Sequence, residues 1–172
     1  LETNQSFGRI ADGAHNWKIL ETITPNSANV EAAPSPILMN EIYSRGTAED
    51  PDWIEIYNNS SSPIDISGFK IYDNGGQSGS KPKMEFAAGT IVPANGFFVI
   101  VVDDAVSANP EGSNFGLGSG GEQVWLEDAS GNIIDTVSFP ALDVTQSYGR
   151  IPDGTYNWRV LNTITKGAAN AQ

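Results

Sequence analysis

Cysteine is absent from the 172-residue chain. Disulfide bonds, thiolate nucleophiles and zinc sites with sulfur ligands are therefore excluded. No signal peptide, transmembrane run or lipidation motif is visible either. The chain begins at Leu1 without a methionine, which leads us to expect a longer parent protein that could carry its own targeting signal.

Basic residues are scarce, with nine Lys and Arg against 21 Asp and Glu, a net charge of −12 and a pI of about 4.2. They are scattered from Arg9 to Lys166 rather than clustered. Nucleic-acid binding needs a basic patch that releases counterions from phosphates, and anionic membranes attract such patches too. We therefore expect no nucleic-acid partner and no direct membrane insertion, and solubility is the simplest role for the acidic surface.

Long apolar stripes at helical spacing are also missing. Instead, 18 glycines and 10 prolines, with many Asn and Ser, separate short alternating apolar segments. This pattern favours an all-β chain with many turns. With 39% hydrophobic residues, the chain can bury enough surface for one good core.

An internal repeat is the dominant feature of the sequence. Residues 146–172 read QSYGRIPDGTYNWRVLNTITKGAANAQ and residues 5–31 read QSFGRIADGAHNWKILETITPNSANVE, with 15 of 27 positions identical. The offset of 141 residues is the size of a whole domain. We expect residues 1–30 to be the C-terminal segment of a preceding repeat, 31–36 a linker and 37–172 one complete domain.

Another interpretation makes residues 5–30 an integral strand pair of a single domain, formed by duplication of one element. In either case the repeated segment reads as two short strands around a turn, which Asp153 and Gly154 supply in the second copy. An isolated hairpin is marginal in water. We therefore predict that residues 5–20 add to a sheet edge of their own domain or of a second copy, through strand exchange or dimerisation.

Four residues of the repeat are expected to pack at the end of the domain: Trp17, Trp158, Arg150 and Asp153. The two tryptophans occupy the same position in the two copies. The single histidine, His15, aligns with Tyr156, so we expect a packing or surface role for it and no Ser-His catalytic pair.

Short apolar segments predict strands at ILMNEIY (37–43), DWIEIYN (52–58), FFVIVVDD (97–104), EQVWLED (122–128) and IIDTVSF (133–139). Alternation places Ile54 and Ile56 toward the core, with Trp53 and Tyr57 on the other face. The continuous run at 97–104 predicts a central strand, buried on both faces. The glycine-rich stretch DNGGQSGSKPK predicts a loop. Many short strands between turns indicate a sandwich or barrel.

Taken in order, ILMNEIY, DWIEIYN, ISGFKIYDNGG, FAAGTIVPANGFFVIV, NFGLGSGGEQVWLEDASGNIIDTVSFP, QSYGRIPDG and TKGAAN resemble a lamin tail domain from about Pro36 to Asn170. The resemblance implies an immunoglobulin-like β-sandwich that acts as a structural or interaction module, without shared catalytic residues. The family is known at the end of nuclear lamins and, repeatedly, in secreted or surface proteins of bacteria.

This chain departs from nuclear lamins in lacking a heptad rod, a prenylation motif and a basic cluster. A nuclear location is therefore not expected. The resemblance implies instead a multi-domain bacterial protein, secreted or on the cell surface. Its partners would be other domains of the same protein or other proteins.

Two alternatives remain open beside the structural reading. Outward aromatics could stack on sugars, and the candidates are Trp53, Tyr57 and Trp125. Oxygen-rich loops could bind a structural calcium ion, the one cofactor considered, and the candidates are Asp50, Asp52, Glu55 and Asp73, with Glu49 and Asn74 beside them. No spacing singles out an acid pair for glycoside hydrolysis, so an enzyme is not expected.

Overall fold

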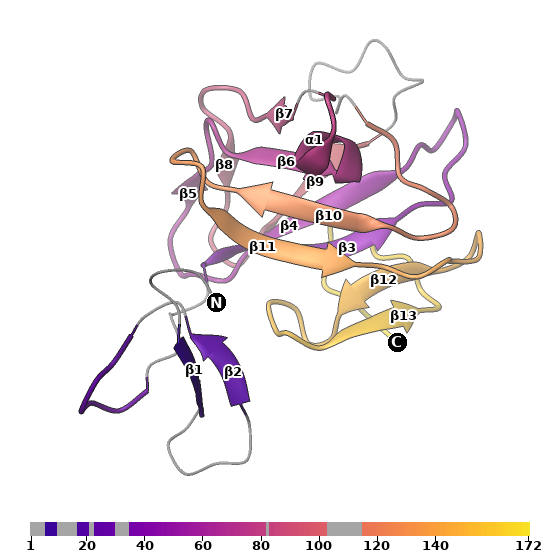
Figure 1. Cartoon of the computed structure of the whole chain (residues 1–172). Helices are drawn as coiled ribbons and strands as arrows, with labels where there is room; N and C mark the ends of the chain where they lie inside the picture. The colour runs from indigo at the N-terminus through magenta and orange to yellow at the C-terminus, as the bar shows by residue number, and fades with distance from the viewer. Residues whose placement is uncertain (1–5, 10–16, 21–22, 30–34, 82, 103–114) are drawn as a thin grey trace. The chain divides into compact units, whose positions relative to one another are not determined.

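A computed structural model describes residues 6–9, 17–20, 23–29, 35–81, 83–102 and 115–172, without the side chains of residues 17–19. The chain divides into two compact units, Leu1–Ser35 and Pro36–Gln172. The described residues are almost entirely strands, turns and loops, as Figure 1 shows, which confirms the all-β prediction. Within the ranges described, no helix is long and apolar enough to cross a membrane.

The first unit contains one hairpin, β1 (Ser6–Arg9) and β2 (Trp17–Leu20). The second unit contains the remaining elements in this order: β3 (Ile37–Tyr43), β4 (Trp53–Asn58), β5 (Ile64–Asp65), β6 (Lys70–Asp73), α1 (Asn74–Ser78), β7 (Met84–Glu85), β8 (Ile91–Val92), β9 (Phe97–Val101), β10 (Gln123–Glu127), β11 (Ile133–Ser138), β12 (Ser147–Arg150) and β13 (Trp158–Leu161).

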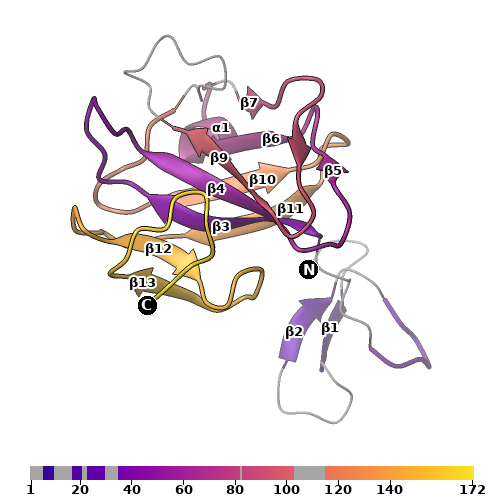
Figure 2. The ribbon, with the colours of Figure 1, turned by 180° about the vertical axis from the view of Figure 1, so that it is seen from behind.

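Two antiparallel sheets of the second unit lie face to face (Figures 1 and 2). One has the order β11-β10-β6-β7 and the other the order β13-β12-β3-β4-β9. A short pair, β5 with β8, lies beside them. The arrangement is the expected immunoglobulin-like β-sandwich, preceded in the chain by the expected hairpin.

The core lies between these sheets, and its inward residues follow the predicted alternation. Ile54 and Ile56 from β4 and Val124 and Leu126 from β10 are fully buried. Each such side chain contributes about 1.5–3 kcal/mol through burial. β3 is buried along its whole length because it is the middle strand of its sheet and is covered on both faces.

The prediction that residues 97–104 form a central strand is wrong. Among the described strands, β9 lies at the end of its sheet, paired only with β4. Most of its residues are half-buried, with Phe98 packed on the core and Phe97 against Tyr57. Contacts on both faces of an edge strand thus produce the same continuous apolar run as a central position.

The predicted glycine-rich loop contains the single described helix, α1. Asp73 caps it, accepting a hydrogen bond from the Gly76 amide at 3.1 Å. Such a cap satisfies an amide that a helix start otherwise leaves unpaired. The glycines of this stretch therefore form one ordered turn beside β6.

Candidate functional site

The end of the second copy binds the sandwich as one structural element, which we call the closing segment (residues 147–170). Its strand β12 pairs on one side with β13 and on the other with β3, with Gly149 opposite Glu41. A Cβ on Gly149 would lie 2.6 Å from Leu161 Cδ1 and 2.7 Å from Asn170 Nδ2, so these two side chains would have to move to admit it. The glycine therefore lets the strand and the tail after it approach closely.

Arg150 is a large polar side chain of the closing segment that is almost completely buried, with only 2% of it exposed. Its Nε donates to the Met39 carbonyl at 2.6 Å, and its Nη2 donates to both carboxylate oxygens of Asp135 at 2.8 and 3.0 Å. The guanidinium lies 4.6 Å from the Trp158 ring, which in turn stacks on Tyr148 at 5.2 Å. Because Asp135 belongs to β11, this one side chain joins the two sheets.

Two buried glutamates, one in β3 and one in β4, accept hydrogen bonds from the polypeptide that follows β13. Glu41 accepts from the Ser147 hydroxyl at 2.5 Å, from the Thr165 amide at 3.1 Å and from the Thr165 hydroxyl at 2.8 Å. Glu55 accepts from the Gly167 amide at 2.7 Å. The two glutamates thus bind this tail mainly through its backbone.

Asn40 and Asp153 complete the polar interior. Asn40 Nδ2 donates to Glu55 at 3.1 Å and to Asp153 at 2.9 Å. Asp153 also accepts from the Asn170 amide at 3.1 Å, while the Asn170 side chain donates to the carbonyls of Asn40 at 3.1 Å and Arg150 at 2.9 Å. We call the receiving set the docking site, and it consists of Met39, Asn40, Glu41, Glu55 and Asp135.

Burial dominates the electrostatics of this site. It raises the pKa of the Glu55 carboxyl to about 8 and also raises the pKa of Glu41, although the hydrogen bonds that each accepts act in the opposite direction. In the described part of the chain, neither glutamate forms an ion pair with a basic residue. The described hydrogen bonds to these carboxyls come from neutral donors of the chain itself.

In its described residues, 6–9, 17–20 and 23–29, the first copy of the repeat has the same local structure. β1 pairs with β2 from Ser6 opposite Leu20 to Arg9 opposite Trp17, and β12 pairs with β13 in the same register 141 positions later. A Cβ on Gly8 would lie 2.7 Å from Leu20 Cδ1 and 2.9 Å from Asn29 Nδ2, so it would meet the same two kinds of side chain as a Cβ on Gly149.

The turn and tail of the first copy agree as well. Asn29 Nδ2 donates to the Arg9 carbonyl at 3.1 Å, and the Thr24 hydroxyl donates to Asn29 Oδ1 at 3.0 Å. The corresponding bonds of the second copy measure 2.9 and 2.9 Å. Asn26 and Gly167 both have positive φ, 60° and 77°. The two copies are thus one structural element used twice.

A scan against protein families adds the last observation: the model described as the Lamin Tail Domain matches residues 30–141, more than half of the chain. The chain belongs to the lamin tail domain family. This family is a non-enzymatic, immunoglobulin-like one that provides structural and protein-interaction modules. The match ends before the closing segment, whereas the resemblance in the sequence extends to Asn170. A comparison with curated proteins finds no match.

The lamin tail fold separates the predicted sugar-binding aromatics. Trp53 was expected to face outward, which is wrong: it is 0% exposed and lies 6.0 Å from the Tyr43 ring. Tyr57 lies in the same strand, half-buried against Phe97. Trp125 belongs to the other sheet and stacks on Tyr72. The three side chains do not form one platform.

The calcium candidates do not converge in this lamin tail domain. Asp50 is exposed and pairs with Lys166 at 2.9 Å, while Asp52 accepts from the Gly46 amide at 2.6 Å. Glu55 was expected beside them, but its carboxyl is buried in the docking site. Asp73 lies in the other sheet at the start of α1. Across the described residues, no group of three metal-binding side chains comes together.

The residues expected to pack at the repeat end have these positions. Trp158, Arg150 and Asp153 lie in the closing segment and contact one another or the docking site. Trp17 takes the equivalent position in β2, and its side chain is outside the described residues, as is His15. Asn40, Glu41 and Asp135 were not predicted from the sequence. A signal existed for the first two, because polar residues interrupt the otherwise apolar ILMNEIY strand.

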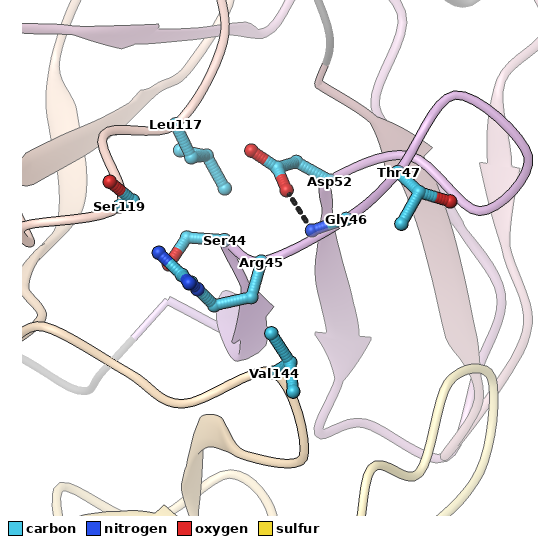
Figure 3. Close-up of a pocket in the computed structure, with 8 residues that line it drawn as sticks. All are labelled: Ser44, Arg45, Gly46, Thr47, Asp52, Leu117, Ser119 and Val144. Atoms are coloured by element: carbon cyan, nitrogen blue, oxygen red, sulfur yellow. Dashed lines mark hydrogen bonds between the residues drawn. The ribbon is translucent and has the colours of Figure 1, made fainter.

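A separate pocket of about 450 Å³ lies beyond the end of β3 (Figure 3). Its lining is Ser44, Arg45, Gly46, Thr47, Asp52, Leu117, Ser119 and Val144. Among the described residues, the buried Ser44 hydroxyl and Arg45 Nε have no hydrogen-bond partner. The pocket offers a guanidinium and hydroxyls to a small anion, but the Asp52 carboxylate lines it too. The charges that it presents therefore nearly cancel.

Proposed function

We propose that residues 36–172 are a non-catalytic structural and interaction module of a larger, tandem-domain bacterial protein that is secreted or exposed on the cell surface. Residues 6–29 close the lamin tail repeat that precedes it. The observation that carries this proposal is the identity of the two hairpin-and-tail elements in register, turn conformation and hydrogen bonds. A segment that recurs one domain length later in the sequence is expected in a protein built of tandem repeated domains.

The proposed role follows from how the interior polar groups are used. Glu41 and Glu55 bind residues of their own chain, and Arg150 joins the two sheets. Such a network fixes one arrangement of the strands and the tail. Rigid modules of this kind set the spacing of their neighbours and present surfaces to partners. The partners proposed are other domains of the same protein or other proteins.

A fusion tests the closing role directly. Residues 36–145, which lack the closing segment, are placed ahead of residues 5–172, so that the first copy follows the truncated sandwich at its natural position. We expect two folded sandwiches and therefore two sets of slowly exchanging amides by hydrogen exchange. The control fusion places residues 36–145 ahead of residues 31–172. Equal protection in the two fusions would overturn the proposal, and recovery of the parent protein from the cytoplasm after cell fractionation would overturn the location.

A further inference from the structure

The pocket beyond the end of β3 contains a guanidinium that the described part of the chain leaves unpaired. Arg45 is half-buried, yet within the described residues its side chain forms no ion pair and donates no hydrogen bond. Its Nε is buried without a partner, and so is the hydroxyl of Ser44, a residue that is only 3% exposed. Buried polar groups are normally paired, because leaving one unpaired costs free energy. In Arg150, by contrast, all three guanidinium nitrogens donate hydrogen bonds.

Hydrogen bonds fix the walls of this pocket. The Tyr43 hydroxyl donates to the Arg45 carbonyl at 3.0 Å and to the Val144 carbonyl at 3.2 Å, which joins the segment after β3 to the segment before β12. The Gly46 amide donates to the Asp52 carboxylate at 2.6 Å. A Cβ on Gly46 would lie 2.4 Å from the backbone nitrogen of Asp52, so glycine lets the loop fold back closely on itself. The pocket is therefore pre-formed, as small-ligand sites usually are.

The volume and the charges of the pocket restrict what can bind there. Its volume of about 450 Å³ lies within the range of about 300–1,000 Å³ that is typical of sites for small molecules. Arg45 attracts an anion, whereas the Asp52 carboxylate in the same lining repels one. No described ion pair joins these two side chains, and Figure 3 shows their charged ends apart. A ligand with one negative and one positive group complements both charges.

The rest of the lining supplies apolar surface. Leu117 belongs to the segment that precedes β10 and is part of the core, while Val144 is 54% exposed. Both side chains line the pocket together with Ser119 (Figure 3). An α-amino acid has three matching parts, since it carries a carboxylate, an ammonium group and a side chain that can be aliphatic.

We propose that this pocket binds an α-amino acid with an aliphatic side chain, in its zwitterionic form. The ligand carboxylate accepts hydrogen bonds from the Arg45 guanidinium, and a turn of that side chain brings Nε and the Ser44 hydroxyl to the same carboxylate. The ammonium group lies toward Asp52, and the side chain packs against Leu117 and Val144. All of these residues belong to one sandwich, so the site goes beyond the proposed function and does not depend on a tandem arrangement.

The experiment adds L-leucine to the isotope-labelled full chain and follows amide chemical shifts by NMR. We expect saturable shifts at Ser44, Arg45, Gly46 and Ser119, with a Kd of about 1 mM for so small a ligand. N-acetyl-L-leucine lacks the ammonium group, and L-leucinamide lacks the carboxylate. Each should bind at least about 10-fold more weakly, because it loses one charged contact and keeps the repulsion from the other charge.

Variants of the lining assign the contacts. Arg45→Gln should weaken leucine binding about 10-fold, because the charged donor is lost. Arg159→Gln is the matched control: it removes the same charge from an exposed position in β13 and should leave binding unchanged. Ser44→Ala should weaken binding without lowering the denaturant midpoint of unfolding, since it removes a buried hydroxyl that has no partner among the described residues.

Four results would overturn the site. These are the absence of shifts up to about 20 mM leucine, far above the expected Kd, equal binding of N-acetyl-L-leucine, equal binding of L-leucinamide, and unchanged leucine binding by Arg45→Gln. The first three use the natural chain, so they decide the matter even if a variant does not fold. Saturable leucine binding beside a tandem fusion that fails would keep this site and reject the closing role.

Discussion

Arg150 and Asp135 form a buried ion pair between the two sheets, with Nη2 at 2.8 Å from one carboxylate oxygen and 3.0 Å from the other. Arg150 is the last residue of β12, and Asp135 lies in the middle of β11. Asp135 also accepts from the Met39 amide at 2.8 Å. Three strands therefore meet at one carboxylate, and the ion pair depends on all of them being in place.

Removal of this arginine should be strongly destabilising. Arg150→Ala leaves the Asp135 carboxylate without its cation in a buried site, so we expect a loss of about 3–5 kcal/mol in the free energy of unfolding. Arg159→Ala removes an exposed charge of the same hairpin, and a change within about 0.5 kcal/mol is expected. Urea unfolding followed by near-UV circular dichroism measures both. Equal losses in the two variants would show that the ion pair does not join the sheets.

Stability should depend on pH through Glu55. Burial raises the pKa of this carboxyl to about 8 from a usual 4.5, so the folded chain holds a proton that the unfolded chain releases. This contribution to stability is complete below pH 4.5 and is lost as pH rises toward 8, at up to about 1.4 kcal/mol per pH unit.

Glu55→Gln tests that assignment, since the amide does not titrate. We expect the variant to be less stable at low pH, because an NH2 group faces the donor Asn40 or Gly167, yet to have a flatter profile between pH 5 and 8 (about the window between the two pKa values). Thermal unfolding across this range is the measurement. An unchanged slope would assign the pH dependence to other groups, of which Glu41 is the nearest with a raised pKa.

The close contacts around Gly149 predict that a larger residue at this position destabilises the domain. A Cβ there would meet Leu161 and Asn170 at 2.6–2.7 Å, so Gly149→Ala should cost about 1–3 kcal/mol by forcing the tail away from β12. Gly120→Ala is the control, because a Cβ at that loop position meets nothing within 4 Å. The measurement is the denaturant midpoint of unfolding of both variants. An unchanged midpoint for Gly149→Ala would mean that the tail adjusts without cost.

Tryptophan variants separate packing from sugar binding. Trp53→Ala empties a fully buried site, so we expect a loss of about 3–5 kcal/mol in the free energy of unfolding. Trp125→Ala removes a half-buried ring and should have a smaller effect. Neither the natural chain nor these variants should bind polysaccharides on a glycan array. Binding by the natural chain that Trp125→Ala abolishes would instead support a carbohydrate-binding function.

The alternation of aliphatic residues predicted a sandwich or a barrel, and the resemblance to the lamin tail family implied the sandwich. In β4 and β10, inward Ile, Val and Leu occupy the core, as a period of two requires. The same reasoning failed at β9 because an apolar run reports contact on both faces and not the number of neighbouring strands. It failed at Trp53 for a related reason, since the outer face of β4 is covered as well.

The candidate site could be predicted only in part. The repeat identified Arg150, Asp153 and Trp158 because two copies allow a comparison within one chain. Their partners could not be found this way, since Asn40 occurs once and lies 113 positions from Asp153, and Asp135 occurs once and lies 15 positions from Arg150. Which polar residue meets which donor is decided by strand order and register, and short strands leave these open.

The closing segment is also synthesised after the strands that it binds. Because a ribosome makes a chain from its N-terminus, β3 and β4 emerge well before residues 147–170 that donate hydrogen bonds to their two buried glutamates. A nascent repeat must therefore hold Glu41 and Glu55 hydrated until its final residues leave the ribosome. The sandwich can therefore complete its polar interior only after its last strand and the tail behind it have left the ribosome.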